Sequence, residues 1–432
     1  MTGARTGRAD YAEVVAMRGA GGRAGRNARR PAALALAALV LVPAAGCGTL
    51  DSGSRARTHV LAADQPFTHP GVLVGKAQLD AVRKNVTAGK QPWLTAYLDM
   101  RDSEYGSYKY RARPVADVSC PGGDVGDVPG AGCVEEREDA IAAYTQALLF
   151  TVTGKRRHAA KAAEIMDAWS ARLTRHSRAG AGLQAGWTGG TWARAAEIVR
   201  HTEGAGWPKD RVRRFATMLR TAHLPHVTGT APDRRGDRDL TAIDAALSIA
   251  VFLDDRKTFD ASLARFRERV PSVFYLEKDG PLPRTQAGSA AKTPEQVRAS
   301  WFRQRTFKDG LTQETCRGFA HVGHAVAATA HAAETAWQQG VDLYEDAADR
   351  LRAALALHAP YQEGRPAPGW LCGGRIERDL GPALEVALNH LENRLDTPVP
   401  AAHRLAVTTR PAGTDGFFVA WETLTHAGNP GT

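Results

Sequence analysis

Apolar residues recur at helical spacing through one segment after another of this chain. Ile141, Tyr144 and Leu148 stand three and four positions apart, with alanines beside them. Such spacing gathers apolar side chains on one face of an α-helix, and that face packs against a core. Strand-like alternation is scarce and is found only at residues 404–409 and 416–420. Further helices are predicted at about residues 156–175, 191–204, 208–225, 240–253, 256–269, 318–339, 344–358 and 381–394.

The number of predicted helices limits the architecture. Nine or more helices of ten to twenty residues, joined in sequence, favour paired helical hairpins. No sequence repeat supports a regular solenoid. We therefore expect a mainly all-α fold, an α/α toroid or incomplete barrel, in which an inner ring of helices faces a cleft and an outer ring covers it. Loops rich in Gly, Pro, Asp and Arg are predicted at residues 116–133, 227–237, 277–298 and 361–378.

The N-terminal 46 residues have the features of an export signal. Arginines between residues 23 and 30 precede an eleven-residue apolar run, Ala32 to Val42, and small residues lead to Cys47. The order is typical of a secretory signal, and the run is too short to span a bilayer. Small residues ending in Cys resemble a bacterial lipobox, although Ala44 stands where Leu is usual. The sequence predicts a lipid anchor on Cys47.

Two alternatives to the lipid anchor are an ordinary cleaved signal and a chain start at Met17; a twin-arginine signal at Arg29-Arg30 is disfavoured by the proline that follows. The predicted organisation is a signal peptide at residues 1–46, the lipidated cysteine and a tether at residues 47–66, and one folded domain at residues 67–432. The protein is expected at the cell surface, attached to the membrane, or secreted.

The charge balance limits the class of partner. The formal net charge is +10, but the leader supplies half of it, and the remainder carries 49 basic and 44 acidic side chains. This mild excess suits an acidic polysaccharide as partner and does not require one. No basic run with interleaved aromatic residues follows the leader, so we expect no nucleic-acid binding. A monomer is expected.

Four cysteines remain beyond Cys47, and an even number in an exported chain favours disulfides. Cys120 and Cys133 bracket a loop rich in Gly, Pro and Asp and are expected to pair. Cys316 and Cys372 form the remaining pair. The alternative is metal binding, but the chain lacks a CxxC motif or a histidine pair at zinc spacing near them. No metal and no cofactor are expected.

An arginine and three histidines fall on one face of the helix that runs to about Gln339. The stripe is either a solvated outer face or a site for anion binding and proton transfer. Histidine is not a typical choice for exposed helix positions, which favours the second interpretation. The stripe consists of Arg317, His321, His324 and His331. The opposite face of the helix is apolar and consists of Phe319, Val322, Val326, Ala330 and Ala333.

The same segment carries a motif. Asp309-Gly310, Gln313-Glu314, Arg317 and His321 follow the spacing DG-x-x-QE-x-x-R-x-x-x-H. This resembles the signature of the alginate-lyase-like superfamily, and other segments match it in order from about residue 67 to 426. These segments are His69 to Val74 with Gln78-Leu79, Gln91 to Trp93, Gly186-Trp187, Ala195 to Ile198, Phe252 to Asp255, Asp279 to Pro281, Gln339 to Tyr344, Glu385 with Asn389-His390, and Trp421 to Thr423.

The resemblance implies an α/α-toroid lyase that cleaves a uronate-containing polysaccharide by β-elimination. Such a reaction needs a group that neutralises the uronate carboxylate, a base near C5 and an acid at the leaving oxygen. By resemblance, Arg317 neutralises the carboxylate, and His321 transfers the proton or joins the neutralisation. His390, beside Asn389, would join from another wall of the cleft. Further implied residues are Gln313 as a substrate contact, Trp187 and Trp421 as sugar-stacking or structural residues, and Glu197 and Glu422 as orienting or structural carboxylates.

Three positions depart from the family pattern. Family members often carry an Asn-Trp or Asn-His pair where this chain has Asp237-Arg238. A carboxylate there repels a uronate unless it is protonated or paired, and Arg238 would compensate. His324 stands where some lyases have a catalytic Tyr, and Gly318 replaces an Asp. Either the chemistry is rearranged, or the substrate differs, or the activity is lost.

Two other functions stay open on the sequence. One is an inverting glycoside hydrolase, which needs two carboxylates across a cleft; Asp237 or Asp239 with Glu314 would supply them. The other is a surface-anchored glycan-binding protein without catalytic activity.

Overall fold

The computed structural model describes residues 61–62, 65–122, 130–229 and 232–431. The predicted signal peptide, Cys47 and nearly all of the predicted tether lie outside these residues. The chain divides into two units, residues 1–56 and 57–432, and every helix and strand described for this protein belongs to the second unit.

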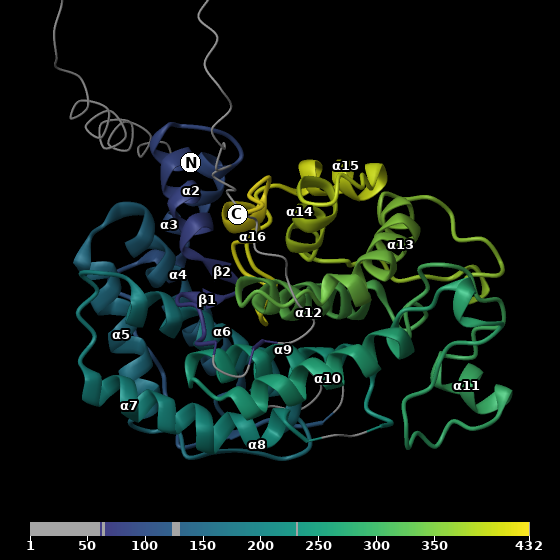
Figure 1. The fold of residues 1–432 in the computed structure, drawn as a ribbon, viewed down its shortest axis with the longest axis horizontal. Helices are drawn as coiled ribbons and strands as arrows, with labels where there is room; N and C mark the ends of the chain where they lie inside the picture. Colours follow the sequence, from purple (N-terminus) through teal and green to yellow (C-terminus); the bar gives the residue numbers. More distant parts are fainter. Residues whose placement is uncertain (1–60, 63–64, 123–129, 230–231, 432) are drawn as a thin grey trace, which may run out of the picture. The chain divides into compact units, whose positions relative to one another are not determined.

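Helices dominate the described residues (Figure 1). The longer ones are α2 (Lys76–Thr87), α3 (Trp93–Asp102), α4 (Cys133–Thr153), α5 (Arg156–Ser170), α6 (Ala181–His201), α7 (Lys209–Met218), α9 (Gly236–Phe252), α10 (Arg256–Val273), α12 (Phe319–Gln338), α13 (Tyr344–Gln362), α14 (Glu385–Asn393) and α15 (Pro400–Thr409). The shorter ones are α8 (Leu224–Val227), α11 (Pro294–Ser300), α16 (Glu422–His426), the π-helix Leu219–His223 and three 3-10 turns at Glu104–Gly106, Glu277–Asp279 and Cys372–Gly374.

Helices α4, α6, α9 and α12 form an inner layer in which each packs against the next. Helices α5, α7, α10 and α13 follow them in the chain and lie outside (Figure 1). The inner helices are buried on nearly every face, so their sequences are rich in Ala and Gly rather than amphipathic. At Gly186, an added Cβ would lie 3.2 Å from the Thr241 methyl group, which shows how closely α6 and α9 approach. This pairing of inner and outer helices confirms the predicted α/α toroid.

Strands are short. β1 (Gly71–Val72) pairs antiparallel with β2 (Val74–Gly75), and β3 (Asp117–Ser119) pairs in parallel with β4 (Arg175–Ser177). The strand predicted at residues 404–409 is wrong, because this stretch belongs to α15. Pro400 begins that helix, and its apolar residues recur at helical spacing. The strand predicted at residues 416–420 contributes only one isolated bridge, between Thr414 and Ala420.

Several predicted boundaries also need correction. Helix α6 begins ten residues before the predicted start, because its Gly-rich first half is stabilised by close packing rather than by helix propensity. Helix α9 begins at Gly236, which places Asp237 in its first turn. Helices α2 and α3 were not predicted, and α11 begins inside the predicted loop 277–298, where Thr293 caps its N-terminus.

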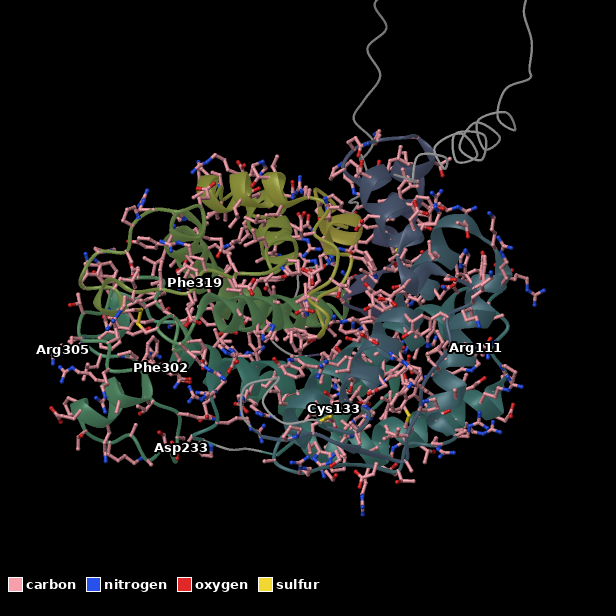
Figure 2. The ribbon with its side chains drawn as sticks, turned by 180° about the vertical axis from the view of Figure 1, so that it is seen from behind. Arg111, Cys133, Asp233, Phe302, Arg305 and Phe319 are labelled. Carbon is pink, nitrogen blue, oxygen red and sulfur yellow. A yellow bond between two sulfur atoms is a disulfide. The ribbon has the colours of Figure 1, made fainter. Side chains whose placement is uncertain are left out.

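Both predicted disulfides are confirmed. Cys120 and Cys133 join the end of β3 to the start of α4, and Cys316 and Cys372 join the segment before α12 to the 3-10 turn after α13. Figure 2 shows the labelled Cys133 and Phe319 from behind. Among the described helices, none combines the length and the apolar character needed to cross a membrane.

Candidate active site

A pocket of about 490 Å³ opens between the first turn of α9, the first half of α12 and α6. Asp237 and Arg238 line it from α9, His321 and His324 from α12, and Trp187 from α6. Two loops, residues 379–383 and 414–419, complete the wall. The structure therefore brings these five predicted site residues together.

Arg317 lies just before α12 and also lines the pocket. The chain enters the helix through Gly318, whose φ is 151°. Residues with a side chain rarely adopt this backbone conformation, and an added Cβ would lie 3.3 Å from a Glu377 oxygen. The glycine that replaces the family's Asp thus has a local reason: the turn that carries Arg317 requires it.

Asp237 lies at the centre of the polar cluster. Its Oδ2 accepts a hydrogen bond of 2.9 Å from His321 Nδ1 and one of 3.3 Å from Arg317 Nη1. Burial favours the neutral acid, but the hydrogen bond from His321 and the charge of Arg317 outweigh it, so the pKa of Asp237 is lowered. Asp237 is therefore a paired carboxylate. Pairing is one of the two conditions, with protonation, under which a carboxylate at this position does not repel a uronate.

Glu314 is the second carboxyl on the same arginine. Its Oε2 accepts a hydrogen bond of 3.2 Å from Arg317 Nη1, and its side chain is fully buried. Burial, followed by the charge of Asp237, raises the pKa of Glu314 to about 7. Near neutral pH the cluster thus holds one firmly ionised carboxylate and one carboxyl that takes up a proton easily.

His321 and His324 reach the pocket from successive turns of α12. Their side chains are 26% and 15% exposed, and their ring centroids are 6.2 Å apart. His324 Nε2 lies 3.5 Å from Asp415 Oδ2. Two imidazoles that lie beside different carboxylates at one pocket are suited to proton transfer in both directions.

An aromatic wall lies beside the histidines. The rings of Trp187 and Phe417 are 4.7 Å apart, and the Arg137 guanidinium lies over both, at 5.5 and 5.0 Å from their centroids. Phe417 and Asp415 were not predicted as site residues. They lie far along the chain, where the strand-like alternation of residues 416–420 gives no indication of a contact with the site.

Several predicted site residues lie elsewhere, and those predictions are corrected. Asn389 and His390 are buried in α14 and do not line the pocket. Asn389 donates a hydrogen bond to the Asn429 carbonyl, and the His390 ring stacks on the Tyr344 ring with centroids 3.4 Å apart. Trp421 is buried and donates to Thr145 Oγ1. Gln313 accepts a hydrogen bond from the Gly236 amide and so positions the start of α9 rather than the substrate.

The stripe on α12 also ends sooner than expected. His331 is fully buried between Glu422 and the Arg194–Asp244 ion pair. Glu422 orients this histidine as the sequence suggested, but away from the pocket.

The carboxylates proposed for a hydrolase do not face each other across a cleft. Asp237 and Glu314 both bind Arg317 Nη1, at 3.3 and 3.2 Å, so they lie side by side. Asp239 is fully buried and paired with Arg234, Arg265 and Arg269. The geometry of these three carboxylates therefore does not favour inverting hydrolysis.

Three clusters among the described residues bring His and acidic ligand atoms within 4.8 Å of one another. One is Asp237, His321 and His324 in the pocket. The second is Glu136, His176 and His223, which is fully buried, and the third is His69, Glu197 and His201, which is partly exposed. Each has donor types that suit a transition metal.

Comparisons with known proteins agree with the fold. A family model described as alginate lyase matches residues 134–368. A search of curated proteins finds no match.

Among solved structures, alginate lyase A1-III from Sphingomonas species A1 is similar, with a TM-score of 0.56 and 15% identity over 83% of this chain and 99% of that one. A Tyr-to-Phe variant of alginate lyase A1-III complexed with a tetrasaccharide has a TM-score of 0.59 and 16% identity, also over 83% of this chain and 99% of that one. An alginate lyase from Bacteroides ovatus has a TM-score of 0.52 and 13% identity over 81% of this chain and 97% of that one. The structures agree in fold, the family model covers more than half of the sequence, and the chain belongs to the alginate lyase family.

Proposed function

We propose that this protein is a polysaccharide lyase that cleaves a uronate-containing, alginate-like polysaccharide by β-elimination in the pocket between α6, α9 and α12. The observation that carries the proposal is the hydrogen bond between Asp237 and His321 beside Arg317. Family membership supplies the reaction class.

His321 is the base in this scheme. Because Asp237 accepts the proton of Nδ1, the imidazole keeps its lone pair on Nε2, as in other carboxylate–histidine pairs. Nε2 removes the C5 proton of the uronate, and the electron pair left on C5 expels the glycosidic oxygen from C4. Asp237 thus orients the base, and it does not neutralise the substrate.

His324 is the acid. It stands where some lyases have a catalytic Tyr, and Asp415 lies 3.5 Å from its Nε2. It donates a proton to the leaving oxygen as the bond breaks, which avoids a free alkoxide. Arg238 and Arg317 line the pocket and stabilise the uronate carboxylate as negative charge moves onto it.

The test is the unsaturated uronate that β-elimination leaves, which absorbs near the ultraviolet edge. Alginate, glucuronan, hyaluronan and pectate are incubated with the protein, and absorbance is followed together with new reducing ends. Reducing ends with matching absorbance support the lyase. Reducing ends without absorbance would mean hydrolysis, and binding without either would mean a glycan-binding protein.

Variants assign the roles. Asp237→Asn keeps the side-chain shape but replaces the carboxylate that fixes the proton of His321 on Nδ1. The base is then no longer held in the reactive tautomer, so kcat is expected to fall on the order of 10²–10⁴-fold with little change in KM. His403→Ala is the matched control, because that histidine is 53% exposed on α15 and outside the pocket. Equal kcat values for Asp237→Asn and the wild type would rule out the orienting role.

We also propose that the protein is an exported, membrane-anchored lipoprotein that acts as a monomer. The support is the leader sequence before Cys47, together with the two disulfides, which persist in oxidising compartments. Cys47→Ser in the native host should abolish incorporation of a labelled fatty acid. Incorporation that survives the substitution would exclude Cys47 as the anchor.

A further inference from the structure

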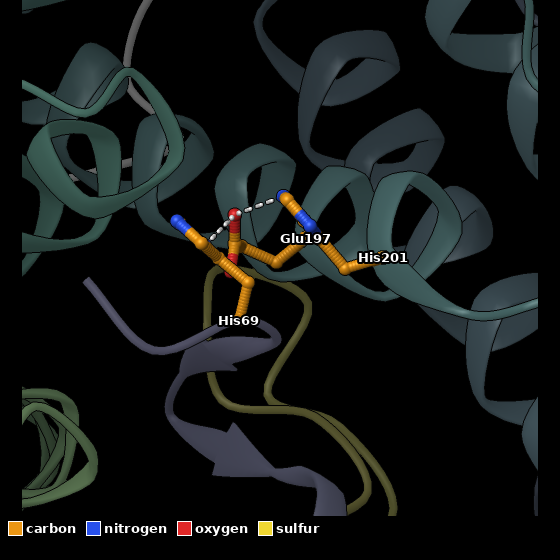
Figure 3. Close-up of side chains that lie close together, drawn as sticks. All are labelled: His69, Glu197 and His201. Atoms are coloured by element: carbon orange, nitrogen blue, oxygen red, sulfur yellow. Dashed lines mark hydrogen bonds and ion pairs between the residues drawn. The ribbon is translucent and has the colours of Figure 1, made fainter. Parts of the chain in front are cut away.

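Figure 3 shows a second polar cluster, formed by His69, Glu197 and His201. It lies toward the C-terminal end of α6, whereas the pocket is lined by Leu183 and Trp187 of that helix. Glu197 and His201 belong to the last turns of α6, and His69 comes from the segment that enters the folded domain. His201 is fourteen residues beyond Trp187, which corresponds to about 21 Å along the helix. The cluster is therefore separate from the candidate active site.

The two imidazoles flank one carboxylate. His69 Nδ1 lies 2.9 Å from Glu197 Oε2, and His201 Nε2 lies 3.5 Å from Glu197 Oε1. The two rings are stacked, with centroids 4.2 Å apart and planes 8° apart, so both present a nitrogen to the same carboxylate (Figure 3). All three ligand atoms lie within 4.8 Å of one another.

A cation at this place would replace the proton between His69 Nδ1 and Glu197. His69 Nε2 lies 3.1 Å from Asp254 Oδ1, and when it donates its proton there, the lone pair of Nδ1 faces Glu197. A lone pair against a carboxylate is repulsive unless a proton or a metal ion lies between them. His201 Nε2 is buried and has no hydrogen-bond partner among the described residues.

We propose that His69, Glu197 and His201 form a binding site for a divalent transition metal, with zinc as the best fit. Two imidazoles, one carboxylate and an open position for water are a common zinc ligand set. Asp254 acts on His69 from the other side, as carboxylates do behind metal-bound histidines. Glu197 is held in turn by the Gly71 amide, which donates to its Oε2 at 3.1 Å.

Access distinguishes this cluster from the buried one. The side chains of His69 and His201 are 15% and 22% exposed, so this cluster lies close to solvent. In the buried cluster, His176 and His223 lie within 3.1 Å of Glu136 and no side chain is exposed. The Gln184 amide also donates to Glu136, so three side chains surround this carboxylate without an ion.

A metal at this site would join three separate parts of the chain. His69 precedes β1, Glu197 and His201 end α6, and Asp254 lies between α9 and α10. The entry segment, at the end of the predicted tether, would then be fixed to an inner helix of the toroid. For this reason we assign the site a structural role. A variant that loses the ion should no longer melt at a higher temperature with Zn²⁺, and its kcat should be unchanged.

The test uses the whole folded domain after dialysis against a chelator. Co²⁺ is titrated and followed by its visible absorption, Zn²⁺ is used to displace it, and melting is measured with and without Zn²⁺. The wild type is expected to bind one equivalent and to melt at a higher temperature with Zn²⁺. No binding, or no change in melting, would overturn the proposal.

Variants locate the ion. His201→Gln should lose binding, and Asp254→Asn should weaken it about 10- to 100-fold, as outer-shell partners do. His223→Gln and His321→Gln, in the other two clusters, should bind as the wild type does. If either of these loses the ion while His201→Gln keeps it, the site is elsewhere. The Asp254 side chain is 54% exposed, so Asp254→Asn is expected to fold normally. Its metal affinity can therefore be measured even if His201→Gln folds poorly.

Discussion

Glu314→Gln tests the electrostatics of the site most directly. Glu314 is fully buried, and its carboxyl shares Arg317 with Asp237. Its pKa is raised from 4.5 to about 7, first by burial and then by the charge of Asp237. At about 1.36 kcal/mol for each pKa unit, ionising Glu314 in the folded protein costs about 3 kcal/mol more than in the unfolded chain.

The sign of the effect follows from proton binding. Between pH 4.5 and about 7 the folded protein holds a proton on Glu314 that the unfolded chain has lost, so stability falls as pH rises. Glutamine carries no charge at any pH and avoids this loss. Glu314→Gln should therefore match the wild type near pH 4 and exceed its free energy of unfolding by about 3 kcal/mol at pH 8.

The assay is urea unfolding followed by circular dichroism, with both disulfides intact, at intervals from pH 4 to pH 8. Glu334→Gln is the matched control with the opposite sign. Glu334 is fully buried as well, but the charge of Arg394 outweighs the effect of burial and lowers its pKa to about 2. Its stabilisation is present above pH 4.5 and is lost as pH falls toward 2, so Glu334→Gln should be less stable at pH 8 by about 3 kcal/mol.

A difference between Glu314→Gln and the wild type that stays constant from pH 4 to pH 8 would refute this reasoning. It would mean that Arg317 keeps Glu314 ionised throughout.

Three further predictions concern the helix, the core and the disulfides. His321→Ala should abolish β-elimination while far-ultraviolet circular dichroism stays unchanged, because His321 is partly exposed in the pocket; normal turnover would exclude it as the base. Phe319→Ala should lower the free energy of unfolding by about 3–5 kcal/mol, because Phe319 is fully buried against His358. Urea unfolding that changes by less than about 1 kcal/mol would mean that the core tolerates the loss. Replacing Cys316 and Cys372 together by Ser opens a loop of 56 residues and should destabilise the protein by about 4 kcal/mol, measured against a reducing-agent control.

The helical stripe was predictable because it needs only local information. Residues three or four apart share a face of any helix, so His321 and His324 had to lie together. Periodicity does not say which element that face meets. His390 illustrates the limit, since its helix was predicted correctly but its face packs on Tyr344 rather than on the cleft.

Other parts of the site depend on contacts between distant segments. Asp415 and Phe417 reach the pocket from a loop that lies nearly one hundred positions beyond His324. No pattern in such a loop marks its contacts. Helix α6 shows the same limit for the fold, because glycines that weaken an isolated helix are what allows α6 to lie close against α9.

The substitution of Asp for the family's Asn acquires a physical meaning from these contacts. An Asn in this place can only offer hydrogen bonds, whereas Asp237 brings a full negative charge, which Arg317 offsets, and accepts the Nδ1 proton of His321 in a hydrogen bond. Because Arg317 already pairs with two carboxyls, the positive charge that meets the substrate shifts toward Arg238. Arg238 lines both this pocket and an adjoining one of about 540 Å³, in which Arg178 and Arg234 also lie. In the proposed mechanism, the same residue change turns a neutralising position into one that orients the base, and Arg238, the next residue of α9, shares the neutralisation with Arg317.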